Sequence, residues 1–215
     1  GFEPLQPPAP TGNDPVYLAA LHACSQLGFI AHDAECIARA WLAQSTRTGQ
    51  FDAALWPCDP RDFGLLTTPR ASAFVTCPQT LGLYAVLPDA NWVGRMARAG
   101  VPTVQLRYKS DDAVAIAQEV RKAVAAVAGT PALLFINDHW QVALDVYTQA
   151  PDSGIYGIHL GQEDIDEADL VAIRSAGLRL GISTHGFAEM LRVAPLNSSY
   201  LALGAVFATP TKTMP

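Results

Sequence analysis

The sequence predicts an α/β fold in which parallel strands alternate with helices. Short apolar runs recur from Leu81 onward, helical patterns fill most of the intervals, and polar side chains gather at one end of the runs. Runs that are apolar at nearly every position are typical of strands buried on both faces of a parallel sheet. Strand–helix units that recur every 20 to 30 residues or so therefore indicate a parallel β/α architecture.

The first 48 residues precede this pattern. Residues 1–14 are rich in proline, and we expect them to be extended. Residues 15–48 predict two helices, because apolar residues recur at helical spacing and Gly28 ends the first. The second helix is expected to begin near His32 and to carry Trp41 on its apolar stripe.

A linker is predicted between these helices and the repeating region. Residues 49–80 contain prolines and glycines among short apolar patches, which is typical of a segment packed on a surface. The predicted organisation is therefore a helical segment over 1–48, a linker over 49–80 and a β/α region over 81–215.

The β/α region contains six predicted strands and four predicted helices. The strands are expected at 81–87, 103–108, 132–138, 156–161, 179–184 and 200–207. Apolar residues at i, i+3 and i+4 predict the helices at 90–100, 111–129, 163–177 and 186–195. An open, doubly wound sheet and a barrel both fit this order. No G-x-G-x-x-G motif follows the first strand, which weakens the dinucleotide-binding version of the open sheet. We therefore favour the barrel.

The composition restricts the classes of partner. Of 215 residues, 50% are hydrophobic and 16% charged, and the net charge is −6. Phosphate backbones need clustered Lys and Arg, so we expect no nucleic-acid partner. No apolar run reaches the roughly 18 residues that span a bilayer, and the N-terminal residues do not resemble a signal peptide. The cysteines lack C-x-x-C spacing, which is typical of reduced thiols in a cytoplasmic protein; they are Cys24, Cys36, Cys58 and Cys77.

Polar side chains follow the predicted strands at the end where β/α barrels carry their chemistry. From the second strand to the sixth they are Gln105, Arg107 and Lys109; Asn137, Asp138 and His139; His159, Gln162, Glu163 and Asp164; Ser183, Thr184 and His185; and Thr209, Thr211 and Lys212. The opposite strand ends are mostly apolar or glycine. This asymmetry predicts an active site at one edge of the sheet.

The residue types at these strand ends suit a phosphorylated substrate. Arg107, Lys109 and Lys212 are cations, and several neighbours are hydroxyl donors. Asp138 and Asp164 end successive strands, which lie about 5 Å apart, so they can share one hard cation. Mg²⁺ takes one or two carboxylates together with phosphate oxygens. The set predicts a magnesium site and a pocket for a phosphorylated or pyrophosphorylated substrate.

Each of these residues also has a purely structural explanation. Asp138 could cap a helix that begins near Trp140, and Asp164 could cap the next one. Arg107 and Lys109 could be solvated, and Ser183 could open a helix. The three strand-end histidines could be satisfied structural groups: His139, His159 and His185. The joint placement at one strand edge favours a functional site.

Five segments follow one another at the predicted strand ends: QLRYK (105–109), IND (136–138), GIHLGQED (157–164), LGIST (180–184) and LGAVFATPTK (203–212). In order and spacing they resemble the motifs of thiamine-phosphate synthase, the enzyme that joins the pyrimidine and thiazole halves of vitamin B1. The resemblance covers about 81–215 and implies a (β/α) TIM barrel. It implies Mg²⁺-dependent coupling of hydroxymethylpyrimidine pyrophosphate with thiazole phosphate, by a dissociative displacement that releases pyrophosphate.

The resemblance also implies residue roles. Asp138 and Asp164 would bind Mg²⁺, and Arg107, Lys109, Ser183 and Lys212 would be the catalytic residues. The pyrimidine pyrophosphate would contact Gln105, Arg107, Lys109, Asn137 and Ser183. The thiazole phosphate and the pyrophosphate would contact Thr209, Thr211 and Lys212. No general base is required, and none stands out.

The sequence departs from the family in two respects. Only six strands are countable where the family has eight, so we expect the barrel to lack its last two strands. We also expect residues up to Pro215 to show little coupling activity by themselves. Residues 12–48 weakly resemble the C-terminal helices of hydroxymethylpyrimidine kinases, which predicts a structural remnant without kinase activity.

Two rival functions stay open at this point. A thiazole tautomerase has the same barrel and relies on a histidine, whereas the pair Asp138 and Asp164 favours the synthase. A degenerate barrel that binds thiamine precursors or regulates a partner needs no catalysis. We expect small-molecule substrates, no nucleic acid, no membrane and a cytoplasmic location, and leave a homo-oligomer open.

Overall fold

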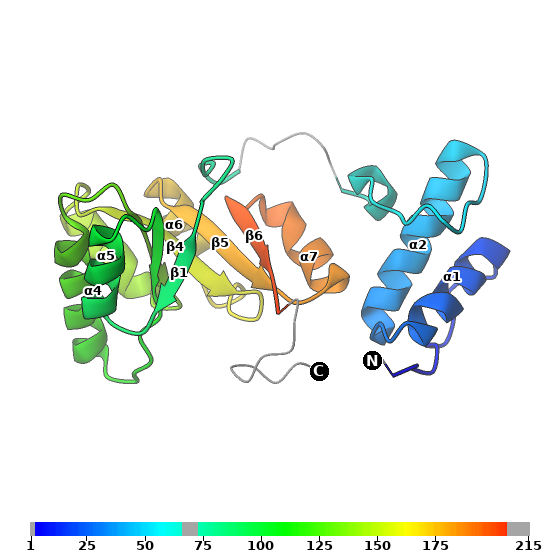
Figure 1. Ribbon diagram of the computed structural model, residues 1–215, viewed down its shortest axis with the longest axis horizontal. Coiled ribbons are helices and arrows are strands. Elements are labelled where there is room, and N and C mark those ends of the chain that lie inside the picture. Colours follow the sequence, from blue (N-terminus) through cyan, green and yellow to red (C-terminus); the bar gives the residue numbers. More distant parts are fainter. Residues whose placement is uncertain (1–2, 66–72, 206–215) are drawn as a thin grey trace. The chain divides into compact units, whose positions relative to one another are not determined.

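The computed structural model describes residues 3–65 and 73–205, which divide into two compact units (Figure 1). A helical unit consists of Gly1–Ala71, His185–Leu196 and Gly204–Pro215. A sheet unit consists of Ser72–Thr184 and Asn197–Leu203. The predicted linker 49–80 is thus shared between the two.

The sheet unit is built on a parallel sheet whose strands follow the order of the chain, β1-β2-β3-β4-β5-β6. The strands are β1 (Tyr84–Leu87), β2 (Thr103–Leu106), β3 (Leu133–Asn137), β4 (Ile155–Gly161), β5 (Arg179–Thr184) and β6 (Tyr200–Leu203). A doubly wound sheet reverses its strand order at a switch point, and no such reversal occurs among these strands. The predicted barrel-type β/α arrangement is therefore confirmed, with six strands in the described residues.

The sheet is strongly curled. Five strand spacings would separate β1 from β6 by about 24 Å in a flat sheet. However, the hydroxyl oxygens of Tyr84 on β1 and Tyr200 on β6 are 2.7 Å apart. The Phe135 ring of β3 packs against both tyrosine rings, at centroid distances of 5.8 and 5.5 Å. Aromatic side chains thus fill the concave interior.

Two glycines make room for these rings. A Cβ atom on Gly157 would lie 2.6 Å from the Phe135 ring, and one on Gly181 would overlap the Tyr200 ring. Gly181 pairs with Tyr200 in the register of β5 and β6. Any larger residue at either glycine would push an aromatic ring out of the interior.

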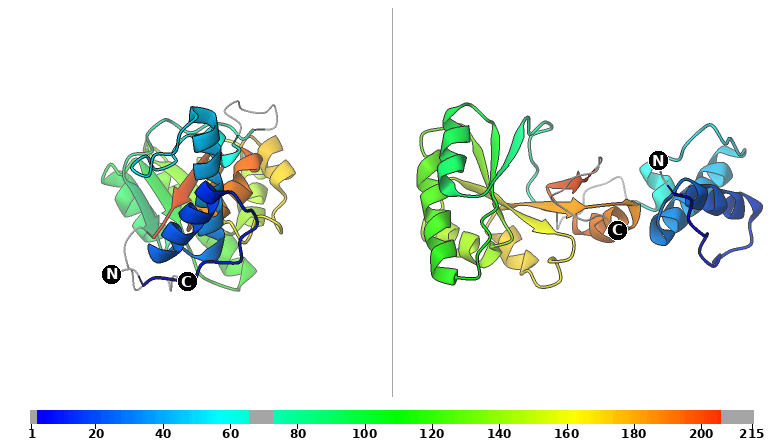
Figure 2. Two further views of the ribbon diagram at one scale, coloured as in Figure 1. Left: turned by 90° about the vertical axis from the view of Figure 1, so that its right-hand side faces the viewer. Right: turned by 60° about the horizontal axis from the view of Figure 1, so that its bottom comes forward.

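Four helices follow strands β1 to β4 and pack beside one another in chain order on one side of the sheet (Figures 1 and 2). They are α3 (Ala90–Arg98), α4 (Ala113–Val127), α5 (Trp140–Gln149) and α6 (Leu170–Ser175). Asp89, Asp112 and Asp169 each accept a hydrogen bond from a backbone N–H of the following helix. These carboxylates cap helix N-termini, where donors lack intrahelical partners.

The predicted helix over 163–177 is too long. Only Leu170–Ser175 is helical, and residues before it form turns. In a continued helix, Glu167 would face Asp164 at i−3 and Glu163 at i−4, and like charges at these spacings repel. Asp169 then supplies the cap at which α6 begins.

Two predicted strands also change length. The first begins at Tyr84 rather than at residue 81, because Gly82 has φ +67°, which is outside the strand region. The last is a strand over Tyr200–Leu203, and residues 206–207 of the predicted run lie outside the described residues.

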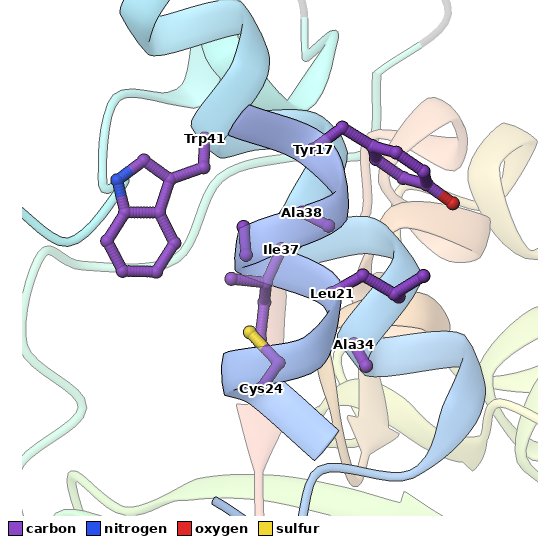
Figure 3. Packing of buried hydrophobic residues seen from close by; sticks show 8 residues of the cluster. Tyr17, Leu21, Cys24, Ala34, Ile37, Ala38 and Trp41 are labelled. Carbon is purple, nitrogen blue, oxygen red and sulfur yellow. The ribbon is translucent and has the colours of Figure 1, made fainter. Parts of the chain in front are cut away.

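The helical unit contains α1 (Pro15–Gln26), α2 (Ala31–Thr48), α7 (Phe187–Val193) and the short 3-10 helices η1 (Pro60–Phe63) and η2 (Ala194–Leu196). The two predicted N-terminal helices are confirmed. They bury a common core, in which Cys24 of α1 and Ile37 of α2 are fully enclosed (Figure 3). The predicted helix over 186–195 packs against α2, and Ala188 N–H donates to the Asp33 carboxylate over 2.8 Å.

The segment between α2 and β1 is held by specific contacts. Arg47 donates two hydrogen bonds to the buried carboxylate of Asp62, at 2.7 and 2.6 Å. In the sheet unit, the buried Phe74 donates its N–H to Asn197 O over 3.0 Å and lies under the Arg174 guanidinium. Asp62 and Phe74, from the described parts of residues 49–80, are thus buried against folded structure.

The four cysteines are free thiols, in agreement with the sequence-based prediction. Across the described ranges, no helix has both the length and the apolar character needed to cross a membrane.

Replacing Gly181 by alanine should destabilise the sheet unit. The added methyl group would overlap the Tyr200 ring, and overpacking of this kind costs about 1–3 kcal/mol. Denaturant unfolding monitored by circular dichroism would measure the loss. The matched control is Gly12→Ala, whose Cβ would make an ordinary 3.6 Å contact with Tyr17.

A double-mutant cycle tests the cause of that loss. In a Tyr200→Leu background, Gly181→Ala should cost much less, because the ring it displaces is gone. An equal cost in both backgrounds would contradict the proposed clash.

Candidate functional site

The curled sheet brings most of the predicted site residues to one edge. Gln105 lies within β2, while Asn137 and Ser183 lie at the carboxyl ends of β3 and β5. Asn137 pairs with His159, and Gly161 pairs with Ser183, in the register of the parallel ladders. Gln105 and Asn137 are buried, so the site has a polar floor beneath its charged rim.

The charged rim includes an ion pair between the loops after β2 and β3. Lys109 Nζ lies 3.3 Å from Asp138 Oδ2, and both side chains remain partly exposed. These residues border a pocket of about 380 Å³, together with Tyr108, Ser110, Asp111 and His139. His139 Nε2 also lies 2.8 Å from Tyr108 O, which ties the two loops together. The pocket therefore has both a cation and a carboxylate on its wall.

Asp138 has an unusual backbone conformation for this position. Its φ is +60°, in the left-handed region that non-glycine residues rarely adopt. Its N–H donates to His159 O over 3.0 Å and extends the β3–β4 ladder by one bond. Helix α5 begins at Trp140 without a side-chain cap, so Asp138 does not serve as a helix cap. The structural alternative for this carboxylate is excluded.

Asp164 is not a helix cap either, because Asp169 caps α6. The Asp164 carboxylate lies over the end of β4, where a Cβ on Gly161 would be 2.8 Å from Oδ2. Burial raises the pKa of Asp164, and the negative charges of Asp138 and Glu163 raise it further. The two predicted metal ligands therefore lie close enough to repel one another.

The carboxylate pair has the donor chemistry of a magnesium site but does not complete one. Among the residues that the structure describes, no three His, Cys, Asp or Glu side chains gather as a metal site. Mg²⁺ keeps several waters and takes one or two carboxylates with phosphate oxygens. A two-aspartate site therefore fits Mg²⁺ only with water and a phosphorylated substrate as the remaining ligands.

Ser183 is part of a part-buried hydrogen-bond chain rather than a helix start. Helix α7 begins four residues later, at Phe187, after Gly186. Ser183 Oγ lies 2.7 Å from His159 Nε2, and His159 Nδ1 lies 2.7 Å from Tyr200 Oη. Burial lowers the pKa of His159 to about 4, although the negative charge of Asp138 opposes this shift. His159 is therefore a neutral imidazole at pH 7.

The remaining predicted site residues are placed differently. The Arg107 side chain is exposed, and its backbone N–H donates to Leu87 O over 2.8 Å. Thr184 Oγ1 donates to Ala202 O over 3.0 Å, so this hydroxyl uses its proton in a hydrogen bond between β5 and β6. Thr209, Thr211 and Lys212 lie outside the described residues.

Comparisons with known proteins identify a family for most of the chain. A family model described as thiamine monophosphate synthase matches residues 73–215. The chain belongs to this family. It is 51% identical over 135 residues to thiamine-phosphate synthase of Neisseria meningitidis serogroup B, which covers 63% of this chain and 62% of that protein. Thiamine-phosphate synthase of Serratia proteamaculans is 45% identical over 150 residues, covering 70% and 66%.

A solved structure, a thiamine phosphate pyrophosphorylase from Pyrococcus furiosus, is 26% identical, with a TM-score of 0.49 over 59% of this chain and 61% of that chain. The chain spans 62% of the length of the Neisseria relative that it matches. The match to the family covers the sheet unit and every predicted site residue.

Three interior residues have no site role predicted from the sequence: Tyr84, His159 and Tyr200. His159 could be a structural group, and both tyrosines fall within predicted strands. A usable signal was the pairing of bulky and minimal residues across strands, since Gly181 lies opposite Tyr200. The register that creates this pairing comes from the structure.

The free energy of unfolding should decrease as the pH is lowered from about 6.5 to about 4, because of His159. The unfolded imidazole takes up a proton near 6.5, whereas the folded one does so only near 4. In this window the unfolded state binds more protons, so acidification favours unfolding, by about 3 kcal/mol in total. Chemical unfolding at a series of pH values would measure this slope.

The variant His159→Gln should remove that contribution from the slope, since glutamine does not titrate. The exposed His22 provides a matched control, and His22→Gln should leave the slope as it is in the wild type. If His159→Gln and wild type lose stability in parallel, His159 is not held neutral by the fold.

Proposed function

We propose that the chain carries the site of an enzyme of thiamine biosynthesis, a thiamine-phosphate synthase. It would couple hydroxymethylpyrimidine pyrophosphate with thiazole phosphate, giving thiamine phosphate and pyrophosphate. Membership of the family supports this proposal. The observation that carries it is the placement of Asp138, Asp164 and Lys109 at the ends of neighbouring strands, above the buried Gln105 and Asn137.

Asp138 and Asp164 are the proposed Mg²⁺ ligands. Their mutual repulsion would be relieved by a divalent cation, and each is already free of a helix-capping role. Bound Mg²⁺ would neutralise the negative charge that develops on a leaving pyrophosphate. The Lys109 ammonium group could then leave its ion pair with Asp138 and bind an anionic oxygen of the substrate.

The other site residues would hold the two substrates. Arg107 and Lys109 would bind the pyrophosphate group, and the buried amides of Gln105 and Asn137 would orient the pyrimidine. Ser183 would donate to the same substrate at its pyrophosphate end. The thiazole phosphate and the pyrophosphate would contact three residues that follow β6 in the chain: Thr209, Thr211 and Lys212.

The proposed reaction is a dissociative displacement. The C–O bond between the pyrimidine methylene and the pyrophosphate breaks first, the electron pair leaves with pyrophosphate, and the thiazole nitrogen attacks the resulting cation. Cationic groups that contact the leaving group lower this barrier because its charge grows in the transition state. No proton has to be removed, so the reaction needs no general base.

The tautomerase alternative requires a histidine that can accept a proton from the substrate. The pKa of His159 is lowered to about 4, and both of its ring nitrogens have hydroxyl partners. This histidine is therefore a poor base at neutral pH. A non-catalytic, precursor-binding barrel would retain Mg²⁺-dependent pyrophosphate binding without turnover, and a coupling assay distinguishes it from the synthase.

Residues 1–48 are proposed to be a structural segment derived from a hydroxymethylpyrimidine kinase. Their described part folds as a helical pair with its own core, which supports a structural role. The free cysteines support a reducing, cytoplasmic location. A homo-oligomer remains part of this proposal and is testable by light scattering.

Replacing Asp164 by asparagine should weaken Mg²⁺-dependent binding of pyrophosphate by about tenfold or more, because one of two anionic ligands is lost. Isothermal titration with pyrophosphate at fixed Mg²⁺ concentrations would measure the change. Coupling turnover at limiting Mg²⁺ should fall in parallel. Glu167→Gln, a charge loss in the same acidic turn, is the control and should have little effect. Binding that is unchanged in Asp164→Asn would remove Asp164 from the metal site.

Replacing Arg107 by alanine should reduce coupling turnover while leaving the melting temperature within a few degrees of the wild type. The side chain is exposed, and surface substitutions usually change stability by no more than about 0.5 kcal/mol. The exposed Arg121 on α4 offers a control, since Arg121→Ala should alter neither quantity. A large stability loss with normal turnover would show that Arg107 is structural.

A further inference from the structure

A continuous chain of hydrogen bonds crosses the concave interior of the sheet unit. Gln105 Nε2 lies 3.3 Å from Tyr84 Oη, and Tyr84 Oη lies 2.7 Å from Tyr200 Oη. Tyr200 Oη is 2.7 Å from His159 Nδ1, and His159 Nε2 is 2.7 Å from Ser183 Oγ. The two ends of the chain are proposed substrate-binding residues. The three residues between them have no assigned role.

The hydrogen bond between Gln105 and Tyr84 determines which group donates its proton in each of the other bonds. An amide nitrogen can only donate, so Tyr84 Oη accepts from Gln105. The single phenolic proton of Tyr84 is then available to Tyr200 Oη, which in turn donates its own proton to His159 Nδ1. A neutral imidazole that accepts at Nδ1 carries its proton at Nε2 and donates it to Ser183 Oγ.

The opposite direction leaves the part-buried Tyr84 hydroxyl without an acceptor among the described residues. If Ser183 donated to Nε2, then Nδ1 would donate to Tyr200, and Tyr200 would donate to Tyr84. The Tyr84 hydroxyl has only Gln105 and Tyr200 as partners among the described residues, so its proton would have no acceptor. A doubly protonated His159 would leave the same Tyr84 hydroxyl proton without an acceptor. It would also place a buried positive charge between two neutral hydroxyls. Both arrangements are disfavoured, because buried donors and charges need partners.

We propose that Tyr200 holds His159 as the Nε2–H tautomer, so that Ser183 accepts from His159 and directs its own hydroxyl proton toward an anionic oxygen of the substrate. His159 and Tyr200 are thus positioning residues that act through Ser183. The identity of the anion, a pyrophosphate group, rests on the proposed function.

The direction of the chain matters for binding an anion. A Ser183 hydroxyl that donated to His159 would present only lone pairs to the site and would repel a pyrophosphate oxygen. A hydroxyl that accepts from His159 is left with a proton to donate, and the interior holds it in place before substrate binds. Donors fixed in advance toward developing negative charge are the most effective form of electrostatic stabilisation.

The test is nitrogen-15 NMR of the histidine side chains in the full 215-residue chain at neutral pH. His159→Gln identifies the His159 signals by their disappearance. The expected result is a protonated, pyrrole-type resonance for Nε2 and an unprotonated, pyridine-type resonance for Nδ1. A protonated Nδ1, with or without a proton on Nε2, would overturn the proposal.

A matched pair of variants tests the role of Tyr200. Tyr200→Phe keeps the ring but removes the donor to Nδ1, so the resonances should shift toward a mixture of the two tautomers. Tyr156→Phe removes a hydroxyl on β4 that has no place in the hydrogen-bond chain, and it should leave the spectrum unchanged. If Tyr200→Phe retains a pure Nε2–H tautomer, Tyr200 does not set the direction.

Binding of pyrophosphate separates this proposal from the proposed function. With Mg²⁺ present, Tyr200→Phe should bind pyrophosphate about tenfold more weakly than Tyr156→Phe, the loss expected for one hydrogen bond to a charged group. Equal affinities would overturn the positioning role. If the wild type shows the Nε2–H tautomer but binds no pyrophosphate, the proposed function fails for this chain and the hydrogen-bond assignment stands.

Discussion

The contact between Tyr84 and Tyr200 is the constraint on which the sheet unit depends. It joins the first and the sixth strands, which lie at opposite edges of the sheet, and it exists only because the sheet curls. Gly157 and Gly181 permit the curl, since any side chain there would occupy the space of an aromatic ring. Packing at the centre thereby fixes the angle at which the carboxyl ends of β2 to β5 converge. The site residues gain their proximity from that convergence, although few of them touch one another directly.

The aspartates of the sheet unit divide into two groups with different surroundings. Asp89, Asp112 and Asp169 satisfy backbone donors at helix N-termini and so stabilise the fold. Neither Asp138 nor Asp164 caps a helix, and the negative charge of Asp138 helps to raise the pKa of Asp164. Neighbouring carboxylates, one of them with a raised pKa, are typical of sites that a cation or a substrate completes. Lys109 pairs with Asp138 and offsets part of the negative charge at this strand edge.

The sequence was sufficient for the strand order and for the strand-end residues, because both follow from local patterns. Apolar runs define the strands, and parallel connectivity places their carboxyl ends at one edge. The extent of the helix before Ile173 was not predictable in this way, since its apolar spacing suits a helix while its crowded carboxylates oppose one. The capping explanations for Asp138 and Asp164 were also undecidable from the sequence, because a cap depends on where a helix begins to within one residue.

The interior residues needed long-range information. His159, Tyr84 and Tyr200 come from three strands that are far apart in the chain, and no local pattern predicts that their polar atoms meet. Their contact gives the site two layers that differ in charge and in exposure to solvent. The rim of Arg107, Lys109 and the aspartates is charged and partly exposed, so solvent screens its interactions. The inner layer is neutral and buried, where each hydrogen bond is directional and an unpaired donor is costly. In the proposed function, Arg107 and Lys109 of the rim would bind the anion, and the neutral layer beneath would fix the single hydroxyl that orients it.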